Sequence, residues 1–110
     1  MKLPNYQRAI IDDRKFIEYC LNPNHHYGKH KAVVFQSALG INLSNFKILK
    51  TAVRRATAIE EAVFMGKFPH GDYYRVDFDM NRIGKTVAVR SNWVVKDGEN
   101  FARLTSVFVL

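Results

Sequence analysis

The densest group of chemically useful side chains in the sequence is a short stretch of histidines and lysines. Residues 25–31 read HHYGKHK and contain three of the four histidines of the chain. Histidine can take up or release a proton near neutral pH, and neighbouring lysines can stabilise negative charge that develops on a phosphate. The stretch therefore predicts acid–base chemistry on an anionic substrate. A polar surface loop that only begins a helix would have the same composition.

A metal site is the competing chemistry for the same loop. His25, His26 and His30 offer nitrogen ligands, but no cysteine or carboxylate lies nearby in the sequence to complete a tetrahedron. Lys29 and Lys31 would also repel a divalent cation. We therefore expect neither a metal ion nor another cofactor.

The whole chain is small and basic. It has 110 residues, with 17 Lys+Arg against 10 Asp+Glu and a formal net charge of +7. A hydrophobic content of 47% excludes a disordered basic tail, and a single cysteine, Cys20, excludes a disulfide framework and a cysteine-rich zinc site. The charge predicts a polyanionic partner, with nucleic acid as the first candidate. With no signal peptide or membrane span recognisable, we expect a cytoplasmic protein with no membrane partner.

The elements that must position these side chains follow from hydrophobic periodicity, which is helical up to about Thr57. A first helix is predicted from Asp12 or Asp13, with Phe16, Tyr19 and Cys20 on one face, ending at Asn22-Pro23-Asn24. The next two helices are predicted at His30–Leu39 and Ser44–Thr57, with Gly40 ending the earlier one.

Beyond Glu60 the pattern alternates, which indicates strands. They are predicted at Ala62–Phe68, Tyr73–Met80, Thr86–Val95 and Arg103–Leu110. Short connections predict an antiparallel meander. The sequence thus predicts one α+β domain over residues 1–110, with three N-terminal helices (about residues 10–57) on one face of a four-stranded sheet (about 61–110).

Alternation also predicts which side chains share the outward face of that sheet. This face is expected to carry Arg75, Arg90, Asn92, Arg103 and Thr105. In the last strand, Val107 falls with Arg103, whereas Phe108 falls on the opposite side. Three guanidiniums on neighbouring strands repel each other unless an anion lies between them, and their planar fork suits phosphate. An ordinary solvated face, with Asp77 and Asp79 pairing some of the arginines, is the other interpretation.

The third helix has a cationic side opposite its apolar stripe. Lys47, Lys50 and Arg54 lie at i, i+3 and i+7, with Arg55 alongside. Like charges at this spacing do not stabilise a helix, which favours a surface for a phosphate backbone or an acidic protein. A merely solvated face fits the same pattern. The expected nucleic-acid-binding residues are Lys29, Lys47, Lys50, Arg54, Arg55, Arg75 and Asn92.

Two segments resemble a known family. The stretch LNPNHHYGKHKAVVFQSALG resembles the LNPxHxxGxxKAxxFxxALG signature of a family of small bacterial domains of unknown function. Related domains occur at the C-termini of contact-dependent and polymorphic toxins. The ending VRSNWVVKDGENFARLTSVFVL is similar to the closing Arg, Trp, Arg-Leu-Thr pattern of that family. The resemblance runs from about Leu3 to Leu110. Such domains look like the barnase–EndoU–colicin–RelE (BECR) group of ribonuclease folds, in which helices precede a four-stranded antiparallel sheet.

This resemblance implies metal-independent RNA cleavage, in which a ribose 2′-hydroxyl attacks the adjacent phosphate. It implies His25 or His30 as general base or acid, Lys31 with Arg90 and Arg103 as a phosphate clamp, and Thr105 as a hydrogen-bond donor to phosphate. Trp93 matches the motif but alternates onto the packed side, so we expect it in the core. His26 stands where the family usually has proline, and His70, isolated in a turn, is expected to be incidental.

We therefore expect a small ribonuclease-type toxin acting on RNA, with tRNA among its candidate substrates, and neutralised by an acidic antitoxin or immunity protein. The alternative is a non-catalytic module that binds nucleic acid or an acidic protein. A toxin fold retained for a housekeeping role is a third interpretation.

Overall fold

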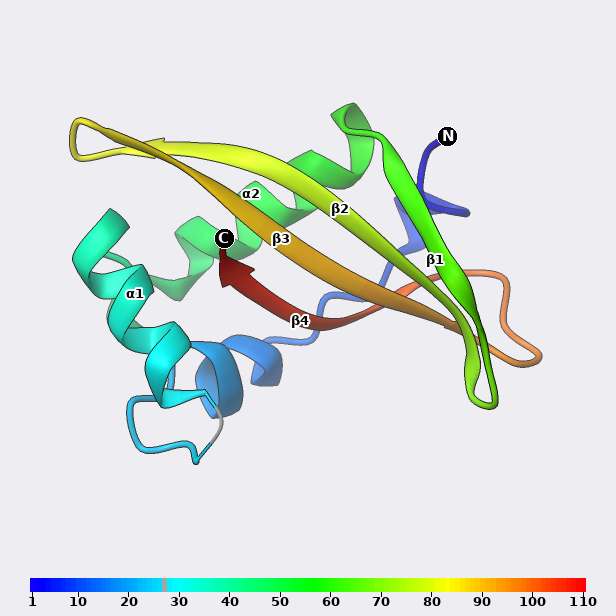
Figure 1. Cartoon of the computed structure of the whole chain (residues 1–110), viewed down its shortest axis with the longest axis horizontal. Helices are drawn as coiled ribbons and strands as arrows, with labels where there is room; N and C mark the ends of the chain where they lie inside the picture. The colour runs from blue at the N-terminus through cyan, green and yellow to red at the C-terminus, as the bar shows by residue number, and fades with distance from the viewer. Residues whose placement is uncertain (27) are drawn as a thin grey trace.

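The computed structural model describes residues 1–26 and 28–110. It is an α+β fold in which a four-stranded antiparallel sheet packs with three principal helices (Figure 1). The helical elements are η1 (Tyr6–Arg8), η2 (Lys15–Cys20), α1 (Lys29–Leu39), η3 (Leu43–Asn45) and α2 (Phe46–Ile59). The strands are β1 (Ala62–Phe68), β2 (Gly71–Arg82), β3 (Lys85–Lys96) and β4 (Arg103–Val109). The predicted fold class is confirmed at this level.

The helical elements differ in kind. η1 and η3 are short 3-10 turns, and η2 is a π-helix that begins at Lys15. It follows closely on Asp12 and Asp13, the residues expected to cap this helix, and Asp12 Oδ1 accepts a hydrogen bond of 2.9 Å from the Arg14 amide. The Leu21 amide donates to the Phe16 carbonyl at 3.0 Å, which is the wider i→i+5 spacing of a π turn. Phe16 and Cys20 are fully buried in this turn, whereas Tyr19 stays at its border.

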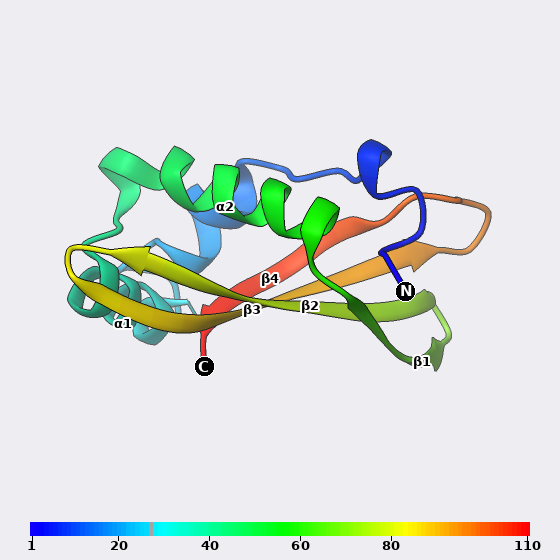
Figure 2. The same cartoon turned by 90° about the horizontal axis from the view of Figure 1, so that it is seen from above.

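The strands form a meander in the order β1-β2-β3-β4. β2 and β3 run further than predicted, because Ile83 and Gly84 alone make the connection, both with positive φ (48° and 73°). Positive φ at both central residues is the geometry of a two-residue hairpin turn. Figure 2 shows α2 above one face of this twisted sheet, with α1 beside the β2–β3 turn.

The core lies between α2, η2 and the covered face of the sheet. Phe16, Leu49, Val53 and Trp93 are all fully buried, so the core position predicted for Trp93 is confirmed. The Trp93 Nε1–H donates to Ser91 Oγ at 2.9 Å, and that hydroxyl donates to the Val76 carbonyl at 2.7 Å in turn. The buried polar atoms of the central strand are thus hydrogen-bonded, as burial requires.

β4 contains a bulge, and the side chains after it lie on the opposite faces of the sheet from those predicted. Asn92 pairs with Ser106 but Trp93 pairs with Leu104, so Thr105 is an extra residue. Its hydroxyl donates to the Asn92 carbonyl at 3.0 Å. Because a bulge shifts the two-residue alternation, Val107 is buried toward the helices and Phe108 takes the opposite face, the reverse of the prediction.

Within the described residues, no single helix is long and apolar enough to cross a membrane. The bent pair Lys29–Leu39 and Leu43–Ile59, which meets at 67°, passes such a test by length and composition only.

Candidate functional site

The face of the sheet away from α2, called here the open face, carries polar side chains in cross-strand rows. One row is Arg75, Asn92 and Ser106, and the next is Asp77, Arg90 and Phe108. Directly opposite residues of antiparallel strands point to the same side. The structure therefore brings together the predicted Arg75, Arg90 and Asn92 and adds Phe108.

The histidine loop reaches the open face through Lys31, in the first turn of α1. Lys31 Nζ lies 4.7 Å from the centroid of the Tyr19 ring and 5.1 Å from that of Phe108. It is also 3.3 Å from the Tyr19 hydroxyl. Because Phe108 is the cross-strand neighbour of Arg90, this contact joins the loop to the cationic row of the sheet. We call Tyr19, His25, Lys31 and Phe108 the loop end of the open face.

His25 is held in a defined orientation at the loop end. Its ring centroid lies 4.6 Å from that of Tyr19, and its Nδ1 accepts a hydrogen bond of 2.9 Å from the Gly28 amide. An Nδ1 that accepts carries a lone pair, so the proton of the neutral imidazole lies on Nε2. His25 also lines a hollow of about 400 Å³ with Tyr19, Lys15 and Arg14.

Gly28 is required where it stands. A Cβ at this position would lie 2.1 Å from the Tyr19 carbonyl oxygen, far inside van der Waals contact. The loop can therefore press against the end of η2 only with glycine here.

Two of the predicted clamp arginines are already paired with carboxylates. Arg90 binds Asp77 through two hydrogen bonds of 2.9 and 3.0 Å, and Arg103 binds Glu99 through two of 2.9 and 2.7 Å. The Arg90 guanidinium lowers the pKa of Asp77, and Arg103 lowers that of Glu99. The solvated-face interpretation was correct in that Asp77 pairs an arginine. A phosphate must compete with these carboxylates.

Arg75 differs from the other two arginines. It forms no ion pair with a carboxylate in the described part of the chain, and its buried Nε has no hydrogen-bond partner there. Of the three predicted guanidiniums on the sheet, Arg75 is thus the one whose charge is least compensated.

Other predicted residues are arranged less compactly. His30 and Lys29 are exposed on the first turn of α1. Thr105 lies at the bulge beside Asn92, and Arg103 is beside Glu99 and over the ring of Phe101. The contacts of the described residues link the loop to Arg90 through Lys31 and Phe108, and place Thr105 further along the sheet.

α2, the helix that carries the predicted basic surface, lies on the other side of the sheet from the open face (Figure 2). Lys50 forms an ion pair with Asp13, and Arg54 donates to the Ala9 carbonyl at 2.8 Å. These two cations hold the N-terminal segment in place. Lys47 and Arg55 are exposed. The structure therefore separates this predicted nucleic-acid surface from Arg90 and the histidine loop.

Three residues near these groups are not assigned to a site by the sequence pattern. Tyr19 falls with the buried Phe16 and Cys20 by periodicity, yet its ring contacts His25 and Lys31. Phe108 lies on the open face and not on the predicted packed face, and His70, expected to be incidental, lines a hollow with Asn92 and Thr105. The available signal was an aromatic residue in the last turn before the histidine loop.

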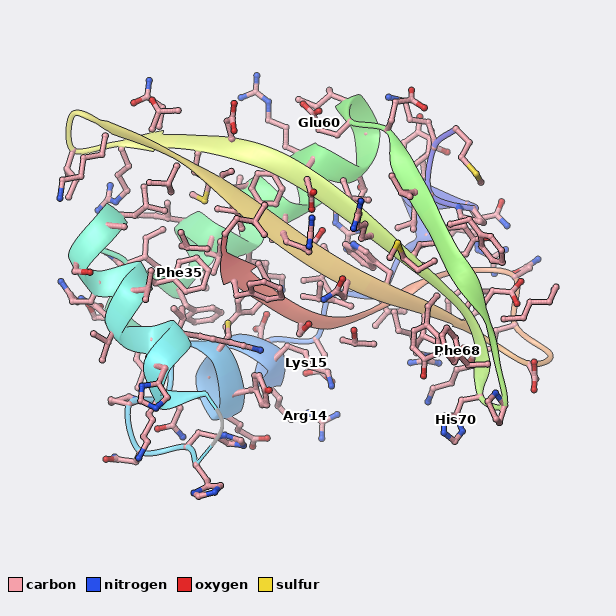
Figure 3. All side chains as sticks on the ribbon, viewed as in Figure 1. Arg14, Lys15, Phe35, Glu60, Phe68 and His70 are labelled. Atoms are coloured by element: carbon pink, nitrogen blue, oxygen red, sulfur yellow. The ribbon has the colours of Figure 1, made fainter. Side chains whose placement is uncertain are left out.

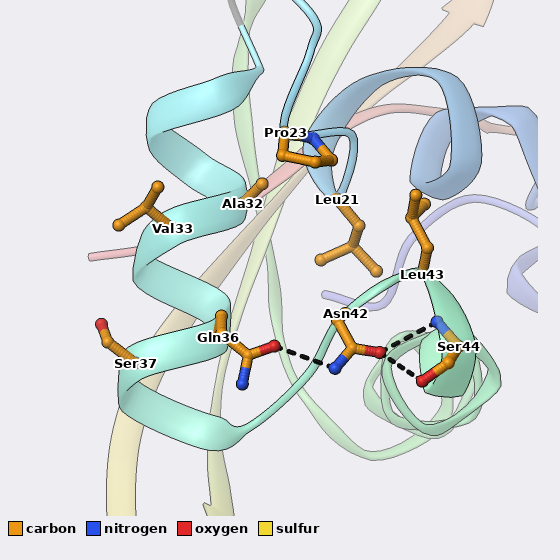
Figure 4. Close-up of a pocket in the computed structure, with 9 residues that line it drawn as sticks. All are labelled: Leu21, Pro23, Ala32, Val33, Gln36, Ser37, Asn42, Leu43 and Ser44. Carbon is orange, nitrogen blue, oxygen red and sulfur yellow. Dashed lines mark hydrogen bonds between the residues drawn. The ribbon is translucent and has the colours of Figure 1, made fainter.

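Cys20 and the hollow behind α1 are two further places where a site could be sought, and neither offers a titratable group for catalysis at neutral pH. Burial raises the pKa of the Cys20 thiol to about 12, so it is no nucleophile at neutral pH. The hollow of about 550 Å³ behind α1 (Figure 4) is lined by apolar side chains and by amides and hydroxyls, with Asn42 bonded to Gln36 and Ser44. In residues 1–26 and 28–110, no group of three or more His, Cys, Asp or Glu side chains could hold a metal ion.

The fold and the open face define a small α+β domain with a cationic sheet surface flanked by a histidine loop. The structure is similar to a chain of a contact-dependent growth inhibition toxin–immunity protein complex from Klebsiella pneumoniae 342, with a TM-score of 0.64 and 13% sequence identity, over 92% of this chain and 99% of that one. At this identity the likeness is one of fold. A comparison with curated proteins finds no match.

The sequence profile described as "Domain of unknown function (DUF6883)" matches residues 2–110. The chain therefore belongs to the DUF6883 family.

Proposed function

We propose that this protein is a ribonuclease-type toxin of the BECR group that cleaves RNA at the loop end of the open face. The observation that carries the proposal is the position of Lys31, which contacts Tyr19 beside the histidine loop and Phe108 beside Arg90. A scissile phosphate bound there would meet Lys31, Arg90 and His25, with His30 as the residue before Lys31 in the first turn of α1.

The reaction follows from these groups. His30, exposed on the first turn of α1, takes the proton of the 2′-hydroxyl, and the 2′-oxygen forms a bond to phosphorus. The bond from phosphorus to the 5′-oxygen breaks, and His25 gives that oxygen a proton from Nε2. For this step His25 must first be protonated at Nδ1, which breaks the hydrogen bond that Nδ1 accepts from the Gly28 amide. Lys31 and Arg90 stabilise the negative charge on the non-bridging oxygens. The products are a 2′,3′-cyclic phosphate and a 5′-hydroxyl.

The same surface suits an acidic immunity protein. The chain has a formal net charge of +7, and the structure to which it is similar comes from a toxin–immunity protein complex. An acidic partner over the open face would engage Arg75 and Lys31 and keep RNA away from them. In the unbound protein, Asp77 and Glu99 provide part of this compensation internally.

The test is cleavage of total tRNA and of single-stranded RNA by the purified protein in excess EDTA, with the product ends identified by mass spectrometry. Wild type should produce 2′,3′-cyclic phosphates, and His25→Ala, His30→Ala and Lys31→Ala should each lower the rate by about 100-fold. Lys85→Ala is the matched control, because Lys85 lies at the β2–β3 turn and donates to the Ser37 carbonyl. Full activity of all three loop variants, or loss of activity in EDTA, would contradict the proposal.

A non-catalytic nucleic-acid-binding module is the second candidate. It is favoured by the exposed Lys47 and Arg55 of α2, two cations that lie away from the histidine loop. Intact RNA after prolonged incubation, together with binding that weakens steeply with salt, would select this second function.

A further inference from the structure

A second hollow opens on the open face at the opposite end from the histidine loop. It has a volume of about 580 Å³. Figure 3 shows Phe68 and His70 at this end, where β1 and β2 meet, with Arg14 and Lys15 toward the other end. Its lining includes Met65, Phe68, His70, Tyr73, Asn92 and Ser106. We call this group the hairpin end of the open face.

One wall of the hollow is an aromatic pair. The rings of Phe68 and Tyr73 lie 4.9 Å apart at 76°, an edge-to-face arrangement, and Phe68 is 52% exposed. Gly66, opposite Tyr73 in the register, has a φ of 127°, and a Cβ there would lie 3.4 Å from the Phe68 ring. Glycine suits this position because of its positive φ, and a Cβ would make ordinary van der Waals contact with the ring. The exposed part of the Phe68 ring is what a planar ligand needs in order to stack.

The facing wall is polar. Asn92 donates through its amide nitrogen to Ser106 Oγ at 3.0 Å. In the described part of the chain, the Asn92 carboxamide oxygen accepts no hydrogen bond and the Ser106 hydroxyl donates none. One acceptor and one donor thus lie side by side across from the aromatic pair. The edges of nucleobases present this kind of donor and acceptor pattern.

A cation lies next to the hollow. Arg75 is directly opposite Asn92, on the same face, and its buried Nε lacks a hydrogen-bond partner within residues 1–26 and 28–110. The same guanidinium forms no ion pair with a carboxylate in the described residues, so its terminal nitrogens can receive an anion. Aromatic rings, polar edge groups and a guanidinium without an ion-pair partner are the three components of single-stranded nucleic-acid binding.

We propose that this hollow binds one nucleobase of single-stranded RNA, stacked on Phe68 and Tyr73, with an adjacent phosphate on Arg75. The inference rests on the proposed function and deepens it, because it makes the hairpin end the place where the substrate is recognised and the loop end the place where it is cleaved. Asn92 and Ser106 read the edge of the base.

The experiment uses a probe that cannot be cleaved. A fluorescein-labelled deoxyuridine oligomer keeps bases and phosphates but lacks the 2′-hydroxyl, and an abasic oligomer of the same length keeps only the backbone. In fluorescence anisotropy titrations, the wild-type protein should bind the deoxyuridine oligomer more tightly than the abasic oligomer. Phe68→Ala should weaken that binding by about tenfold, to the level of the abasic oligomer, and Phe68→Trp should restore it.

Two further variants sharpen the result. Phe64→Leu is the matched control, since Phe64 is 46% exposed on the same strand and does not line the hollow. Leucine keeps an apolar side chain against Tyr74, which does line it. This variant should bind both oligomers as wild type does. Arg75→Gln should lower the affinity for both oligomers by the same factor, and it should reduce the salt dependence of binding by about one phosphate contact.

Equal affinity of wild type for the two oligomers, or unchanged binding by Phe68→Ala, would overturn the proposal and leave the hollow to a protein partner. Failure of the proposed function has a different signature: no RNA would be cleaved, while the difference between the two oligomers would persist and depend on Phe68. If RNA is cleaved but the two oligomers bind equally well, the proposed ribonuclease function stands and the proposed base-binding site is wrong.

Discussion

At the loop end of the open face, a histidine packs on a tyrosine whose ring contacts Lys31, whereas at the hairpin end a histidine and a tyrosine line an aromatic hollow with Arg75 at its margin. The two aromatic rings of the loop end contact Lys31, and its titratable groups can move protons or stabilise charge. The hairpin end offers exposed aromatic rings and amide and hydroxyl groups. The contrast teaches that one strip of sheet can hold chemistry at one end and recognition at the other.

Each end is also fixed by a glycine against a backbone carbonyl. A Cβ on Gly28 would lie 2.1 Å from the Tyr19 oxygen, and a Cβ on Gly71 would lie 2.1 Å from the Val95 oxygen. Gly71 has in addition a φ of 146°, which L side chains rarely adopt. Gly28 positions a loop on a helix, whereas Gly71 starts a central strand.

The largest expected effect separates the two ends by activity. Lys31→Ala should lower RNA cleavage by about 100-fold, because it removes the cation nearest the proposed scissile phosphate. Its affinity for the deoxyuridine oligomer should remain within about twofold of wild type, since the base is held at the other end. Parallel rate measurements and titrations test this, with Lys85→Ala as the control. If Lys31→Ala lowered the cleavage rate and the oligomer affinity by the same factor, the two ends would not have separate roles.

The next effect concerns stability. Gly28→Ala and Gly71→Ala should each reduce the free energy of unfolding by about 2–4 kcal/mol, because backbone atoms must move to admit the methyl group. Gly28→Ala should lose cleavage but keep base binding, and Gly71→Ala should weaken base binding more than cleavage. Urea titrations followed by Trp93 fluorescence give the stabilities. Wild-type behaviour of either variant would contradict the packing described here. Gly84→Ala is a milder comparison, since no atom lies within 4 Å of a Cβ there and only the positive φ of 73° opposes the substitution.

A smaller effect lies between the two ends, at Asp77. Arg90 lowers the pKa of this carboxyl below its ordinary 3.8. The stability that the carboxylate contributes is therefore complete above that value and is lost as the pH falls through the lowered folded-state pKa. Asp77→Asn should flatten the acid dependence of stability in this window. It should also free Arg90 and strengthen RNA binding by a few-fold at neutral pH.

Denaturant midpoints measured at a series of pH values, together with RNA titrations at neutral pH, test this change. Glu60→Gln serves as the control, because Glu60 lies at the end of α2 on the other side of the sheet. Unchanged acid dependence in Asp77→Asn would show that the carboxylate contributes nothing to folding.

The smallest effect is at Cys20, beneath the loop end. Burial raises the pKa of this thiol to about 12, and its side chain is fully buried. An aromatic disulfide reagent should therefore label Cys20 of the native protein only as fast as the protein unfolds. Native protein incubated with the reagent should keep its full rate of RNA cleavage. Rapid stoichiometric labelling with loss of activity would mean that the loop end opens far more readily than its packing indicates.

Much of the fold was predictable because its signals are local. Helical periodicity located α1 and α2, and alternation located the four strands and placed Arg75, Arg90 and Asn92 on one face. The same alternation failed after Thr105, because a bulge adds one residue and exchanges the faces of those that follow. The candidate site was predictable only in part: the loop was found, but neither its tyrosine nor the hollow beside His70.

The sequence by itself determined the order of helices and strands, the excess of positive charge and the histidine loop, because periodicity and composition depend on residues close together in the chain. Only the tertiary structure decided which charges remain available. It paired Arg90 with Asp77, Lys50 with Asp13 and Arg103 with Glu99, and it brought Lys31 onto Phe108. Most of these pairs join distant parts of the chain, and packing against the sheet, rather than any local pattern, sets their distances.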